Sequence, residues 1–132
     1  MNTPTSIVAT CVAILVSGSS YAADPPIAAN QARDRIGKRA TVCGEVVSVV
    51  RVQTPRAGGE QLFMHFDEPP PNSPFIVGII GTELLNVAFR GVDKAVDHKT
   101  VCATGNIKLK GTTPLMVITG PNQLKITDPA RP

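Results

Sequence analysis

Apolar and polar positions alternate through much of this chain, a pattern that predicts short β-strands rather than long helices. The longest such run covers residues 37–52 and carries one glycine, Gly44, inside it. Strict alternation gives this strand an inner face of Val42, Gly44, Val46, Val50 and Val52 and an outer face of Thr41, Cys43, Glu45 and Arg51. Val47 and Val49 break the alternation, which predicts a bend or β-bulge between Gly44 and Ser48.

Four further strands are predicted, at residues 61–66, 75–80, 99–110 and 114–119. The segment 75–80 is apolar on both faces, as in a strand that is covered on two sides. In 99–110 the inward residues are Val101, Ala103, Gly105, Ile107 and Leu109, and the outward ones are Cys102, Thr104, Asn106, Lys108 and Lys110. The prolines of 68–74 donate no hydrogen bond to a sheet, so this segment is predicted to be an extended connection.

Two short helices are predicted beside these strands. Asp24 can cap the first, with Pro25 at its first position and Gly37 at its end. Thr82 can cap the second, and Gly91 can end it. An apolar stripe on the second helix predicts that it covers the open bottom of a barrel; the stripe consists of Leu84, Leu85, Ala88 and Phe89.

The first 22 residues have the pattern of a secretory signal peptide. Residues 7–16 form an apolar run that is too short to span a bilayer, and small residues precede the expected cleavage site after Ala22. The mature protein is therefore expected in the periplasm or outside the cell.

The composition is that of a globular protein, with 132 residues of which 42% are hydrophobic and 17% charged, and this excludes a disordered chain. Residues 23–132 are expected to form one domain, with a barrel at about 37–120 and a frayed tail at 127–132. The net charge of +3 permits polyanion binding but is below what a dedicated DNA-binding domain carries.

The order strand, strand, strand, helix, strand, strand, with a long glycine-bent first strand, resembles the OB-fold. Over about residues 28–126 the sequence resembles small exported bacterial OB-fold proteins described as nucleic-acid-binding-like. The pieces that carry the resemblance are Val42-Cys43-Gly44, Pro71-Asn72 with Phe75, and the hairpin from Gly105 to Val117. The resemblance implies an all-β, five-stranded OB-fold barrel with a helix between strands 3 and 4 and a short N-terminal helix. It leaves the activity open, because the activity of such proteins is generally unassigned.

Cations are the first candidates for a binding site. In an OB-fold, the loops that join strands 1 to 2 and 4 to 5 flank the binding face. In this chain those regions carry Arg51, Arg56, Lys108 and Lys110, which are expected to converge on the phosphates of a single strand. The alternative is that they only keep exposed strand ends soluble.

Phe63 and His65, on the outer face of the strand at 61–66, are candidates for stacking on bases. The alternative is that Phe63 packs beneath a loop and His65 is an ordinary surface residue. His65, Asp67 and His98 are ligand types for a metal, but their spacing matches no metal-binding signature. We therefore expect neither a metal nor another cofactor.

No catalytic motif is present, since the chain lacks a nucleophile elbow, paired histidines and a phosphate-cradling glycine loop. A nuclease of the staphylococcal type would need carboxylates and arginines around a calcium ion, for which Asp67, Glu68 and Arg90 are the loose candidates. A non-enzymatic binding module is the expectation.

Three cysteines occur in the chain, and Cys11 would leave with the signal peptide. The remaining pair, Cys43 and Cys102, would then lie in an oxidising compartment. The first and fourth strands of an OB barrel are antiparallel neighbours, and both cysteines follow an inward valine, so we expect them to form a disulfide. The alternative is two buried free thiols.

Two functions stay open at this point. One is a periplasmic or secreted module that binds single-stranded nucleic acid or another polyanion on its OB face. The other is an envelope protein-interaction or stress-response module, in which the barrel is a scaffold and a partner docks on its apolar strand edges.

Overall fold

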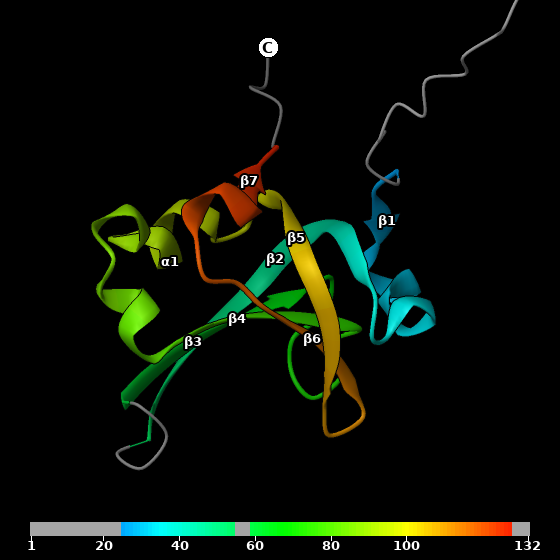
Figure 1. Ribbon diagram of the computed structural model, residues 1–132, viewed down its shortest axis with the longest axis horizontal. Coiled ribbons are helices and arrows are strands. Elements are labelled where there is room, and N and C mark those ends of the chain that lie inside the picture. Colours follow the sequence, from blue (N-terminus) through cyan, green and yellow to red (C-terminus); the bar gives the residue numbers. More distant parts are fainter. Residues whose placement is uncertain (1–24, 55–58, 128–132) are drawn as a thin grey trace, which may run out of the picture.

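The computed structural model describes residues 25–54 and 59–127 (Figure 1). Its strands are β1 (Ile27–Ala28), β2 (Arg39–Thr54), β3 (Gly59–Phe66), β4 (Phe75–Ile80), β5 (Thr100–Lys110), β6 (Thr113–Val117) and β7 (Leu124–Ile126). Its helical segments are the 3-10 turns η1 (Ala29–Arg35), η2 (Gly81–Leu85), η3 (Val87–Phe89) and η4 (Pro121–Gln123) and the α-helix α1 (Val92–Val96). The signal peptide expected at residues 1–22, Arg56 and residues 128–132 of the expected tail lie outside the described residues.

The strands form one mixed seven-stranded sheet in the order β1-β2-β3-β4-β6-β5-β7. An additional antiparallel pairing between β2 and β5 closes five of these strands into a ring (Figure 1). The predicted all-β class is confirmed. Two strands were not predicted, because β1 and β7 have only two and three residues, too few for a pattern of alternation to show.

β2 serves two sides of the ring, as its length suggested. Its first half, to Glu45, pairs with β5, and its second half, from Val46, pairs with β3. The pairing with β3 shifts register between Val46 and Ser48, which confirms the predicted bulge. Gly44 lies where the chain bends, and a Cβ there would come within 2.9 Å of the Asp67 carboxylate, so only glycine fits without a shift of its neighbours.

The bulge reverses the facing of every later residue in β2. Val49, not Val50, packs against the main core, while Val52 packs against a separate cluster on the outer face. The predicted alternation is therefore wrong beyond Val46. Arg51 follows the new alternation and lies on the same side of the sheet as Val49.

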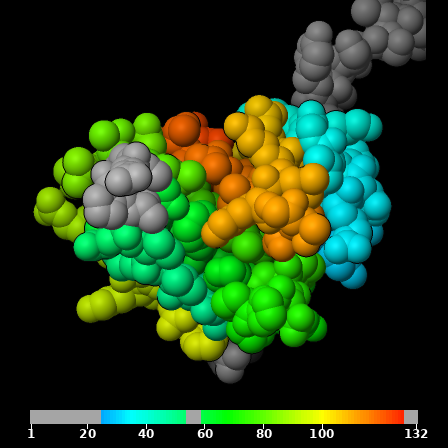
Figure 2. Space-filling model, turned by 90° about the horizontal axis from the view of Figure 1, so that it is seen from below, coloured from blue at the N-terminus to red at the C-terminus, as the bar shows by residue number. Residues whose placement is uncertain are grey.

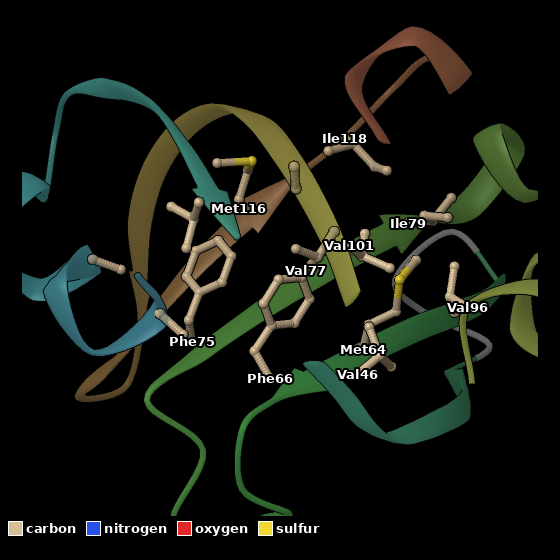
Figure 3. Close-up of a cluster of buried hydrophobic side chains, with 14 of the residues drawn as sticks. Val46, Met64, Phe66, Phe75, Val77, Ile79, Val96, Val101, Met116 and Ile118 are labelled. Carbon is tan, nitrogen blue, oxygen red and sulfur yellow. The ribbon is translucent and has the colours of Figure 1, made fainter. Parts of the chain in front are cut away.

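The main core fills the ring and takes side chains from every long strand (Figure 3). Its largest fully buried side chains include Phe66 and Phe75, whose rings meet edge to face with centroids 5.2 Å apart. β4 is covered on both faces, as predicted, because Phe75 and Val77 enter the main core while Ile76 packs outside it.

The prediction of one helix between Thr82 and Gly91 is wrong. Two 3-10 turns, η2 and η3, occupy this segment, and α1 begins after Gly91 instead of ending there. Asn86 has an extended backbone that separates the turns, and its side chain accepts a hydrogen bond from the backbone N–H of Ala88. The N-terminal helix is likewise a 3-10 turn, η1, rather than a helix that begins at Pro25.

Cys43 and Cys102 form the predicted disulfide across β2 and β5. The two residues are directly opposed in the sheet, with their Cα atoms 4.1 Å apart. No helix among residues 25–54 and 59–127 is long and apolar enough to cross a membrane.

Candidate functional site

Cations from two distant segments meet beside the β2–β5 pairing. Arg39 of β2 is opposed to Asn106 of β5, and Lys108 lies two residues further along the same face of β5. The pairing continues past the end of β2, because the N–H of Ile107 donates to the carbonyl of Lys38 at 2.9 Å. Lys38 and Arg39 are therefore neighbours of the last residues of β5.

Two more cations complete this group. Arg33 of η1 lines a hollow of about 410 Å³ together with Thr112 and Thr113 of the β5–β6 turn. Lys110, at the end of β5, lines an adjoining hollow that also includes Thr113. We call Arg33, Lys38, Arg39, Lys108 and Lys110 the basic cluster.

The basic cluster is exposed and carries little compensating charge. All five side chains are exposed, and none forms an ion pair with a carboxylate in the described part of the chain. One carboxylate, Asp34, lies within the same N-terminal segment. In Figure 2 the gold and orange atoms of the β5–β6 hairpin adjoin the cyan atoms of this N-terminal segment. A local excess of positive charge is thus open to solvent.

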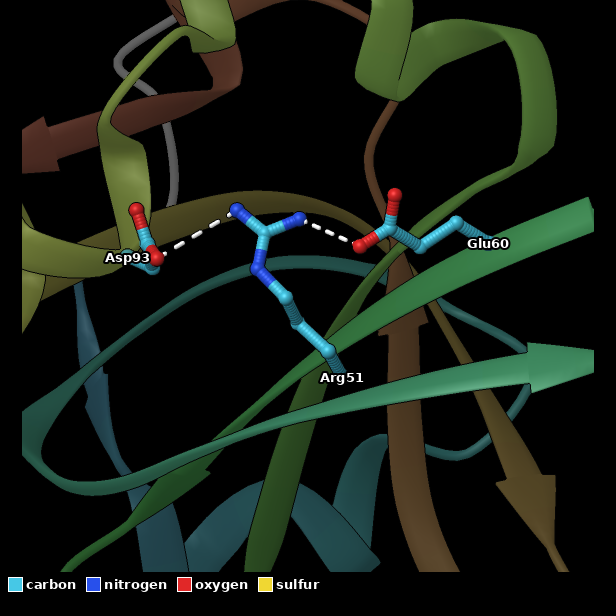
Figure 4. Close-up of polar contacts among 3 residues, drawn as sticks. All are labelled: Arg51, Glu60 and Asp93. Atoms are coloured by element: carbon cyan, nitrogen blue, oxygen red, sulfur yellow. Dashed lines mark hydrogen bonds and ion pairs between the residues drawn. The ribbon is translucent and has the colours of Figure 1, made fainter.

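Arg51 does not join the basic cluster. Its guanidinium lies 2.6 Å from the carboxylate of Glu60 and 3.3 Å from that of Asp93 (Figure 4). The hydrogen bond to Glu60 is the main reason that the pKa of Arg51 is raised. Two carboxylates therefore neutralise Arg51. Of the four cations predicted to converge, the structure brings together Lys108 and Lys110, while Arg56 lies outside the described residues.

Phe63 lies on the outer face, as predicted, but is covered. Its ring packs with Ile76 and Leu115, and Gly78 leaves room for it on the neighbouring strand. The ammonium of Lys110 lies 3.9 Å from the ring centroid, a cation–π contact, and only 4% of Phe63 is exposed. A base could stack on this ring only after Lys110 moves.

His65 is also on the outer face, and it is buried rather than an ordinary surface residue. Its Nδ1 lies 2.7 Å from the Ser73 hydroxyl, which donates to the carbonyl of Glu68 at 2.7 Å. Since the single hydroxyl proton goes to that carbonyl, Ser73 accepts from an Nδ1–H of His65. Burial, and then the positive charge of Lys110, lower the pKa of His65. At neutral pH the ring is therefore neutral, with an unprotonated Nε2.

The other metal-ligand candidates, Asp67 and His98, do not form a site with His65. A carboxylate oxygen of Asp67 accepts from the backbone N–H of Glu45 at 3.1 Å, which holds the bend of β2. His98 is exposed and lies 3.7 Å from the carboxylate of Asp97. In the part of the chain that the structure describes, no three histidine, cysteine or acidic residues are grouped as a metal site would require.

The sequence contained a signal for the missed cations. In an antiparallel pair the two residue numbers have a constant sum, and the predicted disulfide fixes that sum. Extended from Cys43 and Cys102, this register places Arg39 opposite Asn106, as observed. The prediction of the disulfide was therefore enough to bring Lys38 and Arg39 beside Lys108.

No protein-family model matches the chain, and no curated protein matches its sequence. RecG bound to a three-way DNA junction is similar in structure over 80% of this chain, with 16% identity and a TM-score of 0.54. A proposed aspartyl-tRNA synthetase from Leishmania major is similar over 88%, with 8% identity and a TM-score of 0.50. A proposed nucleic acid-binding lipoprotein from Klebsiella pneumoniae is similar over 75%, with 18% identity and a TM-score of 0.44.

These similarities concern the fold alone, because the sequence identities are low. The chain spans 13% of the RecG chain and 23% of the Leishmania protein, and 77% of the lipoprotein. The strand-rich fold therefore recurs within larger proteins, one of which is bound to DNA.

Proposed function

We propose that this chain is a non-enzymatic OB-fold binding module for extended polyanions, with single-stranded nucleic acid as the first candidate. The observation that carries the proposal is the basic cluster, in which all five cations are exposed and lack a carboxylate partner among the described residues. Phosphate groups are the natural counter-charges for such a surface.

The order of the elements supports the OB-fold part of the proposal. Within the ring, β2, β3 and β4 precede the helical segment of residues 81–96, and β5 and β6 follow it. This is the order strand, strand, strand, helix, strand, strand, and β2 is the long first strand, which changes its partner from β5 to β3 after Glu45. The similarity to the structure of RecG bound to DNA supports the fold alone. It identifies no ligand for this chain.

The expected signal peptide determines the compartment in which the protein would bind its ligand. If residues 1–22 direct secretion, the module works in the periplasm or outside the cell, and its polyanionic ligand is one that occurs there. This location is part of the proposal.

Fluorescence anisotropy with a labelled single-stranded oligonucleotide at low salt tests the proposal. The triple variant Arg33→Gln, Arg39→Gln, Lys108→Gln removes three cations of the basic cluster and leaves the outer-face residues Phe63, His65 and Lys110 in place. We expect its affinity to fall roughly tenfold or more, since each lost phosphate contact also loses the release of counterions.

A matched control removes the same charge elsewhere, with Arg90→Gln, Lys94→Gln and Lys125→Gln, three cations that lie outside the basic cluster. We expect this control to bind within about twofold of the wild type. Equal losses in both variants would mean that only net charge matters, and absence of wild-type binding at tens of micromolar protein would end the proposal.

One observation favours the alternative, a module that binds another protein. Leu85 and Val87 are 81% and 70% exposed, and Leu85 borders a hollow of about 490 Å³ lined also by Phe89 and Arg90. Affinity purification from an envelope fraction compares the wild type with Leu85→Ser, Val87→Ser. A stoichiometric protein that is lost with these substitutions, together with no oligonucleotide binding, would make this function the better one.

A further inference from the structure

A hollow beside the basic cluster has the chemistry to hold a single planar group. Its volume is about 260 Å³, and its lining includes His65 of β3, Ile76 of β4 and Lys110 of β5. Pro70, Pro71 and Ser73 of the connection before β4, and Thr113 of β6, complete the lining. We call this space the His65 hollow.

The ring of His65 is held in place before any ligand arrives. Ser73 holds the Nδ1–H of His65, so the other ring nitrogen, Nε2, can only accept a hydrogen bond. Nothing in the described part of the chain donates to Nε2, and no fully buried side-chain nitrogen or oxygen there lacks a partner. Nε2 therefore keeps some exposure, and the hollow that the ring lines is where a donor can reach it.

The His65 hollow adjoins a second hollow that is lined by another cation of the basic cluster. It shares Pro71, Ser73 and Thr113 with the neighbouring hollow of about 410 Å³, and that second hollow is lined by Arg33. The two hollows therefore lie side by side, with Lys110 lining the first and Arg33 lining the second. A chain whose anionic groups rest on both of these cations would run past the His65 hollow.

We propose that the His65 hollow takes one nucleobase of a single-stranded nucleic acid, with an N–H of the base donating to Nε2 of His65 and the flanking phosphates on Lys110 and Arg33. This inference rests on the proposed function and narrows its ligand class. Polyphosphate offers no hydrogen-bond donor and no flat apolar group at neutral pH. A base offers both, since its face can pack on Ile76 and the prolines while its edge donates.

Two oligonucleotides of equal length and charge test the inference, one with all its bases and one abasic at every sugar. We expect the wild type to bind the first at least about fivefold more tightly at neutral pH, the effect of roughly one hydrogen bond. The variant His65→Leu is expected to lose most of this preference, because the acceptor is gone while the cations and the apolar lining remain. Polyphosphate is expected to bind wild type and variant alike.

Nitrogen NMR of His65 in the wild type gives a readout that does not depend on the variant being folded. The Nε2 resonance is expected to move when the complete oligonucleotide is added and to stay when the abasic one is added. Equal binding of the two oligonucleotides by the wild type would overturn the inference while leaving polyanion binding intact. Full base preference in His65→Leu would also overturn it. If neither oligonucleotide binds at low salt, the proposed function fails, and the inference fails with it.

Discussion

At the scale of single residues, His65 combines burial with a hydrogen bond that commits one of its two ring nitrogens. Only 7% of the residue is exposed, and its Nδ1–H donates a hydrogen bond to the Ser73 hydroxyl. Burial and the nearby ammonium of Lys110 lower the pKa of His65 from its ordinary value of 6.5. The folded state therefore favours the neutral ring, whereas the unfolded chain protonates at the ordinary pKa.

This difference predicts a pH-dependent loss of stability. Because the folded pKa lies below the unfolded one, the stabilisation is complete above pH 6.5 and is lost as the pH falls through the lowered pKa. The free energy of unfolding should decrease by at most about 1.4 kcal/mol for each pH unit in that window. Urea unfolding of wild type and His65→Leu between pH 7.5 and pH 5 measures it.

The variant provides the control, since both proteins keep His98 and every carboxylate. The wild type should lose more stability than His65→Leu as the pH falls below 6.5. Parallel curves for the two proteins would show that the buried ring is not the group that titrates.

Arg51 illustrates which residue-level predictions fail. Its outward position in the sequence pattern depended on unbroken alternation, and one extra residue between Val46 and Ser48 reverses the facing of all that follow. The pattern showed that a bulge was needed but not which residue it would insert. The side of the sheet on which Arg51 lies, and its pairing with Glu60 and Asp93, therefore could not be read from the sequence.

At the scale of elements, strong periodicity decided what could be predicted. β5 alternates from Val101 to Ile107 without a break, and its inward residues up to Ile107 are buried as expected. Leu109, predicted to face inward, is 54% exposed, because it lies at the end of the strand beside the β5–β6 turn. The segment from Gly81 to Val96 has a weaker pattern, and local backbone preferences decide its structure. Gly91 has a left-handed backbone conformation with a φ of 74° and precedes α1 as its N-cap. The sequence pattern had predicted that Gly91 ends a helix.

The pairing of β2 with β5 positions the basic cluster, and the disulfide locks that pairing. Cys43 and Cys102 are separated by 59 residues, so their bond restricts a long loop in the unfolded chain. The chain-entropy relation gives about 4 kcal/mol of stabilisation for a loop of this length, as an upper figure. The double variant Cys43→Ser, Cys102→Ser should lose up to that amount in free energy of unfolding.

Urea unfolding with and without reductant checks this prediction. The wild type should lose stability when reduced, and the double variant should be insensitive to reductant. In the expected mature protein, residues 23–132, two free thiols per unfolded, unreduced chain would contradict the disulfide itself.

At the scale of the whole molecule, the distribution of charge matters more than its total. The net charge of +3 is modest, but five exposed cations lie together beside the β5–β6 hairpin, and Arg51 is neutralised on the core side of the sheet. Composition therefore understated the electrostatic character of one surface. Only long-range strand pairing, which joins residues near 38 to residues near 108, reveals it.

The salt dependence of oligonucleotide binding tests the central claim most directly, because its slope counts the phosphates that the protein neutralises. Five contacts, at roughly 0.7 each for a single strand, predict a slope of about −3.5 for the logarithm of the association constant against the logarithm of salt concentration. The triple variant Arg33→Gln, Arg39→Gln, Lys108→Gln keeps two contacts and should give about −1.4. The control with Arg90, Lys94 and Lys125 replaced should keep the wild-type slope. A wild-type slope near zero, or the same slope in the triple variant as in the wild type, would contradict the assignment of the basic cluster as the binding surface.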